Sequence, residues 1–180
     1  NWKGRRDSKR GHPQTAVSTW LNGGLFGVPF DYFEAAYFAG GNTAGGFVDT
    51  VDKFAFSDDS RTTLETGLST VRISLAGAAN SGTAAYFGGG YALTTSVDKF
   101  AFSDDSRTTL GTGLSAAREA LAAAANSGTA AYFGGGNEAA ANVTTVDKFA
   151  FSDDGRTTLG TGLSSARCRE LGYCRIFRWW

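Results

Sequence analysis

The sequence predicts an all-β fold built from repeated sheets of about four short antiparallel strands. The string Val-Asp-Lys-Phe-Ala-Phe-Ser-Asp-Asp occurs three times, beginning at Val51, Val97 and Val146. Between its copies lie short apolar runs bounded by turn residues, which is a strand-like rather than a helical pattern. A unit of this size cannot bury its own apolar face, so copies of it are expected to stack on one another.

The first part of each unit is expected to be a strand, a turn and a second strand. In the second copy, side chains alternate along residues 97–102, which places Phe100 and Phe102 on one face. Residues 103–106, Ser-Asp-Asp-Ser, predict a tight turn, because Asp and Ser side chains can bond to nearby backbone groups. A second, Thr-rich strand is expected at residues 108–112.

The remainder of the unit is expected to be a hairpin. Residues 121–125 and 129–133 are its predicted strands, and Asn-Ser-Gly at 126–128 is its turn, where glycine supplies a positive φ. The alanines of residues 121–125 also have high helix propensity, so a helix is the alternative. The strand is favoured because the equivalent stretch, residues 73–79, contains a β-branched residue and a glycine.

All variation in repeat length falls in one connection. The repeated valine is followed 35 residues later by Tyr-Phe-Gly-Gly-Gly in both complete copies, while the connection after that string differs in length. Surface loops tolerate insertions better than strands do, so residues 42–50, 91–96 and 137–145 are predicted to be loops on one side. The candidate binding residues in these loops are Tyr91, Leu93, Thr94, Asn137, Glu138 and Asn142.

The repeat resembles the kelch repeat of β-propellers. Shared features are an apolar strand that ends in two glycines, a loop of variable length, a following apolar strand with an acidic turn, and a later arginine at Arg72, Arg118 and Arg167. The usual tryptophan of the family is replaced by leucine. Over roughly residues 37–167, the resemblance implies four-stranded antiparallel blades, about three of them, in a partial β-propeller. The residues expected to be structural because they recur are Gly88, Gly89, Gly134, Gly135, Phe100, Phe149 and Arg118.

Both ends depart from the repeat. Residues 1–36 are interpreted as a degenerate half-repeat or a flexible basic terminus, in preference to a nucleic-acid or membrane-surface arm. With permitted codons, a shift of one base turns residues 169–180 into a sequence close to the missing repeat, so we expect an out-of-frame tail within residues 168–180. The alternative is an Arg- and Trp-rich tail that binds a membrane or a partner. Because the sequence has no methionine, we expect a fragment or a processed product.

No catalytic, cofactor or metal site is expected. Cys168, Cys174 and His12 are too few to form a typical zinc site. The repeated Asp-Asp pairs could bind calcium, but their recurrence in every copy favours a structural turn. With one histidine, no Ser/His/Asp constellation can be assembled, and the glycine triplets precede no helix of the kind a phosphate-binding loop needs.

Three functions are therefore considered. The first is a non-enzymatic scaffold that binds a protein or a glycan through the variable loops. The second is a structural part of an extracellular or virion-associated fibre, and the third is a kelch-type oxidase domain, whose metal ligands the sequence lacks. With a formal net charge of zero and no apolar run of about 20 residues, no nucleic-acid or membrane partner is expected. Association of copies, or further blades from a longer chain, would complete the partial propeller.

Overall fold

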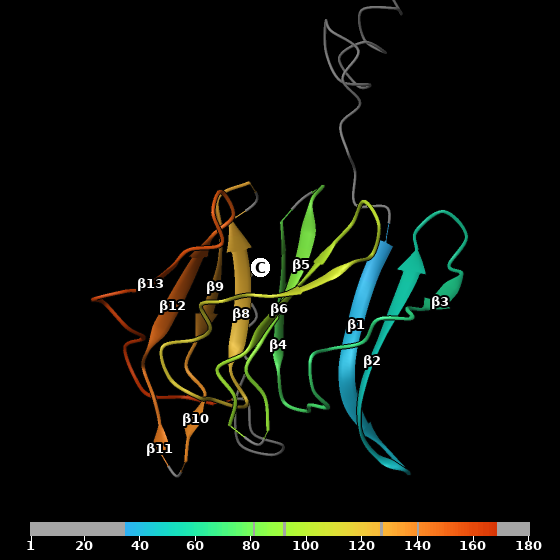
Figure 1. The fold of residues 1–180 in the computed structure, drawn as a ribbon. Helices are drawn as coiled ribbons and strands as arrows, with labels where there is room; N and C mark the ends of the chain where they lie inside the picture. The colour runs from blue at the N-terminus through green and yellow to red at the C-terminus, as the bar shows by residue number, and fades with distance from the viewer. Residues whose placement is uncertain (1–34, 81, 92, 127, 140, 169–180) are drawn as a thin grey trace, which may run out of the picture. The chain divides into compact units, whose positions relative to one another are not determined.

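The protein is all-β over residues 35–80, 82–91, 93–126, 128–139 and 141–168, which are the residues described by this computed structural model. All of these residues fall in one of the chain's two compact units, Phe33–Trp180. They contain no helix (Figure 1). The strands are β1 (Ala35–Thr43), β2 (Gly46–Ala55), β3 (Arg61–Thr63), β4 (Ala76–Asn80), β5 (Ala84–Gly88), β6 (Val97–Ala101), β7 (Arg107–Thr109), β8 (Ala122–Asn126), β9 (Ala130–Gly134), β10 (Asn137–Glu138), β11 (Ala141–Asn142), β12 (Val146–Ala150) and β13 (Arg156–Thr158).

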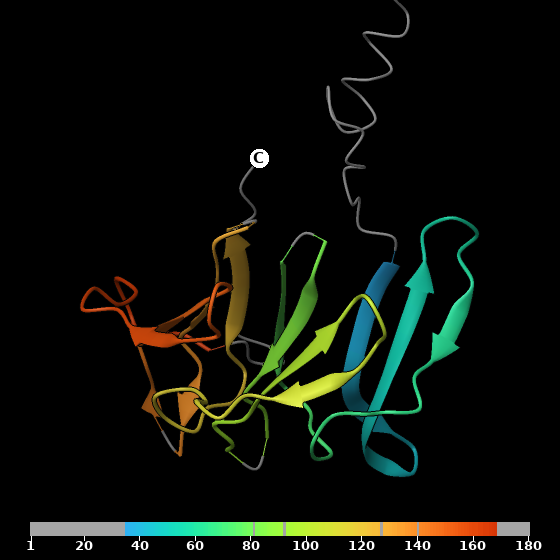
Figure 2. The same cartoon turned by 45° about the horizontal axis from the view of Figure 1, so that its top comes forward.

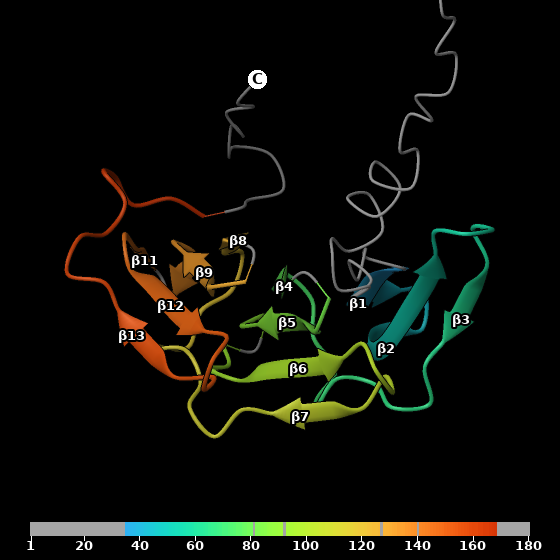
Figure 3. The same ribbon diagram turned by 90° about the horizontal axis from the view of Figure 1, so that it is seen from above.

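Three antiparallel sheets of three or four strands follow one another along the described chain, and β10 and β11 form a separate two-stranded sheet. Sheet 1 has the order β1-β2-β3, sheet 2 the order β4-β5-β6-β7, and sheet 3 the order β8-β9-β12-β13. Figure 3 shows β4 and β8 at one end of their sheets and β7 and β13 at the other. The registers repeat, because Tyr86 opposes Lys99 in sheet 2 as Tyr132 opposes Lys148 in sheet 3. This fold is consistent with part of a β-propeller, as the sequence predicted.

The alanine-rich segment is a strand. β8 pairs with β9 over its whole length, with Ala124 opposite Tyr132, so sheet pairing overrides the helix propensity of alanine. The Thr-rich strand β7 is shorter than predicted and begins one residue earlier, at Arg107. The Leu110 amide makes one more bond of this ladder, to the Val97 carbonyl, and the chain then bends in the segment that contains Gly111 and Gly113.

The acidic turns after β2, β6 and β12 have the geometry that the sequence predicted. In each turn the first aspartate accepts a hydrogen bond from the amide two residues later, as Asp104 does from Ser106 at 3.0 Å. The second aspartate has a left-handed backbone, with φ of 57° at Asp105 and 56° at Asp154. Aspartate tolerates this conformation better than most residues, which accounts for the Asp-Asp pair in every copy.

The hydrophobic core consists of two layers between neighbouring sheets. One layer joins sheets 1 and 2 through Val51 and Leu68 on one side and Phe87 and Phe100 on the other. The second layer joins sheets 2 and 3 and includes Val97, which belongs to the same strand as Phe100. Successive side chains of a strand point to opposite faces, so β6 contributes to both layers and sheet 2 is buried on both faces.

Sheet 1 has three strands in the described chain, whereas sheets 2 and 3 have four. Its position for a strand equivalent to β4 adjoins a cavity of about 300 Å³ lined by Ala35, Tyr37, Gly77 and Phe87, among other residues. The sequence predicted a degenerate half-repeat or a flexible terminus at residues 1–36. Residues 1–34 lie outside the described part of the chain.

Candidate functional site: a rim of loops

The connections of variable length lie on one side of the sheets, at the lower edge in Figures 1 and 2. Two of them differ from the predicted loops. Residues 42–50 continue β1 and β2 into a hairpin with a tight turn at Ala44 and Gly45, and residues 137–145 contain the short hairpin of β10 and β11. Pairing within the connection satisfies backbone groups that a loop would leave to water, so these two segments are ordered projections.

An exposed aromatic pair links the first two connections. The rings of Phe47, from the β1–β2 hairpin, and Tyr91, after β5, lie 5.4 Å apart between centroids in an edge-to-face arrangement. Phe47 is 41% exposed and Tyr91 is 49% exposed. Large apolar side chains with this exposure are available to a partner, and their mutual contact restricts their conformations before binding.

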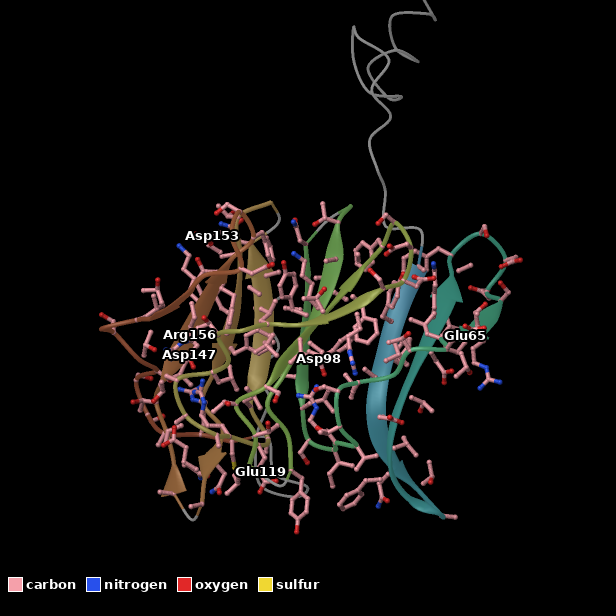
Figure 4. All side chains as sticks on the ribbon, in the orientation of Figure 1. Glu65, Asp98, Glu119, Asp147, Asp153 and Arg156 are labelled. Carbon is pink, nitrogen blue, oxygen red and sulfur yellow. The ribbon has the colours of Figure 1, made fainter. Side chains whose placement is uncertain are left out.

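Backbone hydrogen bonds continue this row to the third connection. The Tyr91 amide bonds to the Ile73 carbonyl at 2.7 Å, and the Ala120 amide bonds to the Ser74 carbonyl at 2.8 Å. Glu119, labelled at the lower edge of Figure 4, pairs with Asn137 through two backbone hydrogen bonds of 2.9 and 3.1 Å. We call the surface formed by Phe47, Tyr91, Glu119, Asn137, Glu138 and Asn142 the rim.

The predicted loop residues differ in their availability to a partner. Tyr91 and Asn142 are exposed, while Leu93, Asn137 and Glu138 are half-buried. Asn137 donates to the Asn142 side-chain oxygen at 3.2 Å, so these two amides act together. Thr94 has a structural contact instead: its hydroxyl accepts from the Ser96 amide at 3.1 Å and donates to the Ser96 hydroxyl at 3.0 Å.

Phe47 and Glu119 were not among the candidates predicted from the sequence. Phe47 has no equivalent in the other connections, so it could have been noticed as the one aromatic residue in residues 42–50. Glu119 lies in the constant block, and only the pairing with Asn137 brings it to the rim.

The recurring arginine has a structural role that the sequence did not specify. Arg118, from the connection after sheet 2, forms a buried ion pair with Asp147 of β12 at 2.5 Å, and both side chains are 0% exposed. It also donates to the carbonyls of Gly135 and Thr145, at 3.0 and 2.9 Å. Burial lowers the pKa of Arg118, and the charge of Asp147 opposes this shift. An arginine remains protonated in proteins, so the pair is charged.

The same contact joins sheets 1 and 2. Arg72 pairs with Asp98 of β6, and both side chains are again buried. In each pair the acceptor oxygen also receives the amide and hydroxyl of a serine, Ser69 at Asp98 and Ser115 at Asp147, all at 2.9 Å. Figure 4 labels the two aspartates, Asp98 and Asp147, on their separate sheets.

A second polar contact between sheets repeats in the same way. The Tyr86 hydroxyl donates to Asp154 at 2.7 Å, and the Lys99 ammonium bonds to the same carboxylate at 2.8 Å. Tyr37 and Lys53 bind Asp105 with equivalent geometry. Burial, followed by the hydrogen bond and the charge of the aspartate, raises the pKa of both tyrosines.

The other recurring residues pack as structural positions. Phe100 and Phe149 are fully buried in the two core layers. Gly89 and Gly135 have φ of 69° and 66°, and a Cβ on either would lie within 2.6 Å of an arginine carbonyl. Gly88 and Gly134 end β5 and β9. A Cβ on Gly88 would lie 2.9 Å from the Phe133 ring, so close packing favours glycine there, whereas a Cβ on Gly134 would make ordinary contacts of 3.6 Å or more.

The described residues include no group of three or more His, Cys, Asp or Glu side chains placed to hold a metal ion. Over the same residues, no helix is long and apolar enough to cross a membrane. Cys168 is buried, whereas His12, Cys174 and the expected out-of-frame tail at 169–180 lie outside the described chain.

Comparison of the sequence with models of protein families and with curated proteins gives no match. The class of the protein therefore rests on its own structure. It is an all-β repeat protein with antiparallel sheets of three or four strands, consistent with a partial β-propeller.

Proposed function

We propose that this chain is a non-enzymatic repeat scaffold that binds a protein or glycan partner through the rim. The observation that carries the proposal is the exposed Phe47–Tyr91 pair, formed by connections from two different sheets. Aromatic side chains dominate the binding energy of many interfaces. The Asn137, Glu138 and Asn142 side chains of the third connection add donors and acceptors that can fix the orientation of a ligand.

Backbone hydrogen bonds hold the rim in place, which favours a binding function for these segments over a role as simple connections between strands. The aromatic pair lies on a hairpin and on a backbone hydrogen-bonded turn, and the third projection is bonded to Glu119. Binding elements held by a scaffold lose less conformational entropy when a partner is bound. Loops that vary around a constant framework are also the usual place for recognition residues.

We further propose that the repeat is a kelch-like variant. Its support is that Gly40 and Gly89 allow close approach of the carbonyls of Arg72 and Arg118, and that these two arginines are the buried links to the next sheet. Leucine replaces the family's tryptophan at Leu64, Leu110 and Leu159, and of these Leu110 is buried in the core.

The rim can be tested with a glycan array and, in parallel, with a photo-reactive group placed at residue 91 to capture a protein partner. For any ligand found, the double variant Phe47→Ala, Tyr91→Ala is expected to bind at least about tenfold more weakly, a loss of about 1.4 kcal/mol. Phe56→Ala, at an exposed aromatic position just past the opposite end of β2 from Phe47, is the matched control. A ligand whose affinity is unchanged by the double variant would remove the rim from the proposal.

A structural fibre component is the second candidate function. It is favoured by one specific feature, which is the complementarity of the two outer sheet faces described next.

A further inference from the structure

The outer face of sheet 1 carries side chains whose equivalents are buried in the other sheets. Phe38 is 61% exposed, whereas its equivalents Phe87 and Phe133 are buried. Phe56 is 57% exposed, whereas Phe102 stacks on Tyr37 of the preceding sheet with ring centroids 5.0 Å apart. We define the head face as Phe38, Asp52, Phe54, Phe56 and Asp59.

The geometry of the head face already matches that of the buried faces. Phe38 and Phe54 meet edge to face at 5.6 Å, as Phe133 and Phe149 do at 5.7 Å inside the core. Asp52 accepts from the Thr63 hydroxyl at 2.5 Å, as Asp147 accepts from a threonine at 2.6 Å. The head face therefore has the same side-chain conformation as the sheet faces that are buried against a neighbouring sheet.

Asp52 and Asp59 lack the contacts that complete their equivalents. At Asp98 and Asp147 the second carboxylate oxygen binds an arginine and a serine. Among the described residues, the nearest cation to that oxygen of Asp52 is the exposed Arg61, 3.8 Å away. For Asp59, no tyrosine or lysine of the described chain occupies the place that Tyr86 and Lys99 take at Asp154.

The outer face of sheet 3 carries the other half of the same contact. We define the tail face as Tyr132, Val146, Lys148, Leu163 and Arg167. Val97 and Leu114, the equivalents of Val146 and Leu163 in sheet 2, are buried, while Val146 and Leu163 are only half-buried. Arg167 is exposed and bonds to Ser164 and Ser165 nearby.

We infer that the tail face of one copy of this chain binds the head face of a second copy, through the contacts that join the sheets within a copy. Arg167 then pairs with Asp52 of the second copy, as Arg118 pairs with Asp147. Tyr132 and Lys148 bind Asp59 of the second copy, as Tyr86 and Lys99 bind Asp154. Phe56 of that copy stacks on Tyr132, as Phe151 packs on Tyr86 with ring centroids 5.2 Å apart.

A second copy is the occupant that the observations favour. Of the residues that define the two faces, the cationic ones lie on the tail face and the carboxylates on the head face, so the two faces complement each other. Arg61 lies 3.8 Å from Asp52, as Arg156 lies 3.8 Å from Asp147 in sheet 3, so it does not replace the missing buried arginine. A contact between the tail face and the head face is heterologous, and it closes into a ring or continues as a filament. Two copies would bring together six sheets, which lies within the roughly four to eight of closed propellers. The residues of the two faces are different from those of the rim, so the inference does not rest on the proposed binding function.

The test is the mass of the whole chain in solution, measured by sedimentation velocity over a wide range of concentration. The native chain is expected to exceed its monomer mass of 18.9 kDa increasingly as concentration rises. Arg167→Glu and Asp52→Asn alter partly or fully exposed side chains, so each variant is expected to fold and to stay at the monomer mass. Glu65→Gln, at another exposed position, should associate like the native chain.

Mixing the two variants separates this contact from non-specific association. The mixture combines one intact tail face with one intact head face, so it should form a complex larger than either variant forms alone. A native chain that stays monomeric at every concentration would overturn the inference, whether its faces are covered by its own terminal segment or by another protein. So would variants that associate like the native chain, or a mixture that gains no mass.

Discussion

Replacement of Arg118 by alanine should destabilise the protein far more than the same replacement at Arg167. Both residues occupy the same place in the repeat, but Arg118 is 0% exposed and paired with Asp147, whereas Arg167 lies on an open face. The two variants therefore differ mainly in whether a following sheet covers the arginine.

The size of the effect follows from what Arg118→Ala leaves behind. The Asp147 carboxylate would stay buried without its cation, and the Gly135 and Thr145 carbonyls would each lose a donor. Loss of one partner from a buried ion pair costs about 3–5 kcal/mol. Asp147 keeps hydrogen bonds from Ser115 and Thr158, so the lower end, about 3 kcal/mol, is expected.

The assay is urea unfolding followed by far-ultraviolet circular dichroism, at a concentration at which the native chain is monomeric. Arg118→Ala should lower the free energy of unfolding by about 3 kcal/mol, while Arg167→Ala should change it by less than about 0.5 kcal/mol. Equal losses of unfolding free energy in the two variants would refute the packing of sheet 3 against Arg118.

Three further predictions use the same matched design. Asp154→Ala removes the acceptor of Tyr86 and Lys99 and should lower the free energy of unfolding in urea by about 1 kcal/mol more than Asp59→Ala does. Asp59 is the matched control because it has the same left-handed backbone, and equal losses in the two variants would contradict the prediction. Gly89→Ala puts a Cβ 2.6 Å from a carbonyl oxygen and should lower the stability by about 2 kcal/mol or more in thermal unfolding. Gly111→Ala should lower it by less than about 0.5 kcal/mol, because no atom lies within 4 Å of the added Cβ. Burial raises the pKa of Tyr86, so the unfolded state releases this proton first and the free energy of unfolding should fall as pH rises above about 10. Tyr86→Phe should make that fall smaller, and an unchanged pH dependence would count against the buried phenol.

The sequence was sufficient to predict the repeating unit because its signals are local. Alternation along residues 97–101, the Asp-Asp turn and the Asn-Ser-Gly turn each act over a few residues, and β6, β8 and β9 formed within one residue of the expected positions. The two hairpins within the connections were missed, since Gly45 and Ala139 lie in segments with no alternating apolar pattern.

The contacts between sheets could not be predicted in the same way. Arg118 and Asp147 are 29 residues apart, and Tyr86 and Asp154 are 68 apart. Every copy contains an arginine, a lysine, a tyrosine and these aspartates, so the sequence permits pairing within a copy as well as between copies. The order in which the sheets stack decides which pairing forms, and that order depends on burial of both faces of β6.

The rim was predicted in position and only partly in composition. Length variation located the connections, and Tyr91 and Asn142 proved to be exposed there. The partner of Tyr91 is Phe47, from the preceding sheet. A pair of this kind depends on the distance between neighbouring sheets, which no spacing along the chain encodes.

The most direct test of the central claim, that each sheet is joined to the next through a buried arginine–aspartate pair, is a double-mutant cycle. Arg118→Ala, Asp147→Ala and the double variant should give a coupling free energy of about 2 kcal/mol or more in urea unfolding. The control cycle, with Arg167 in place of Arg118, should give a coupling near zero. A coupling near zero for Arg118 with Asp147 would contradict the account.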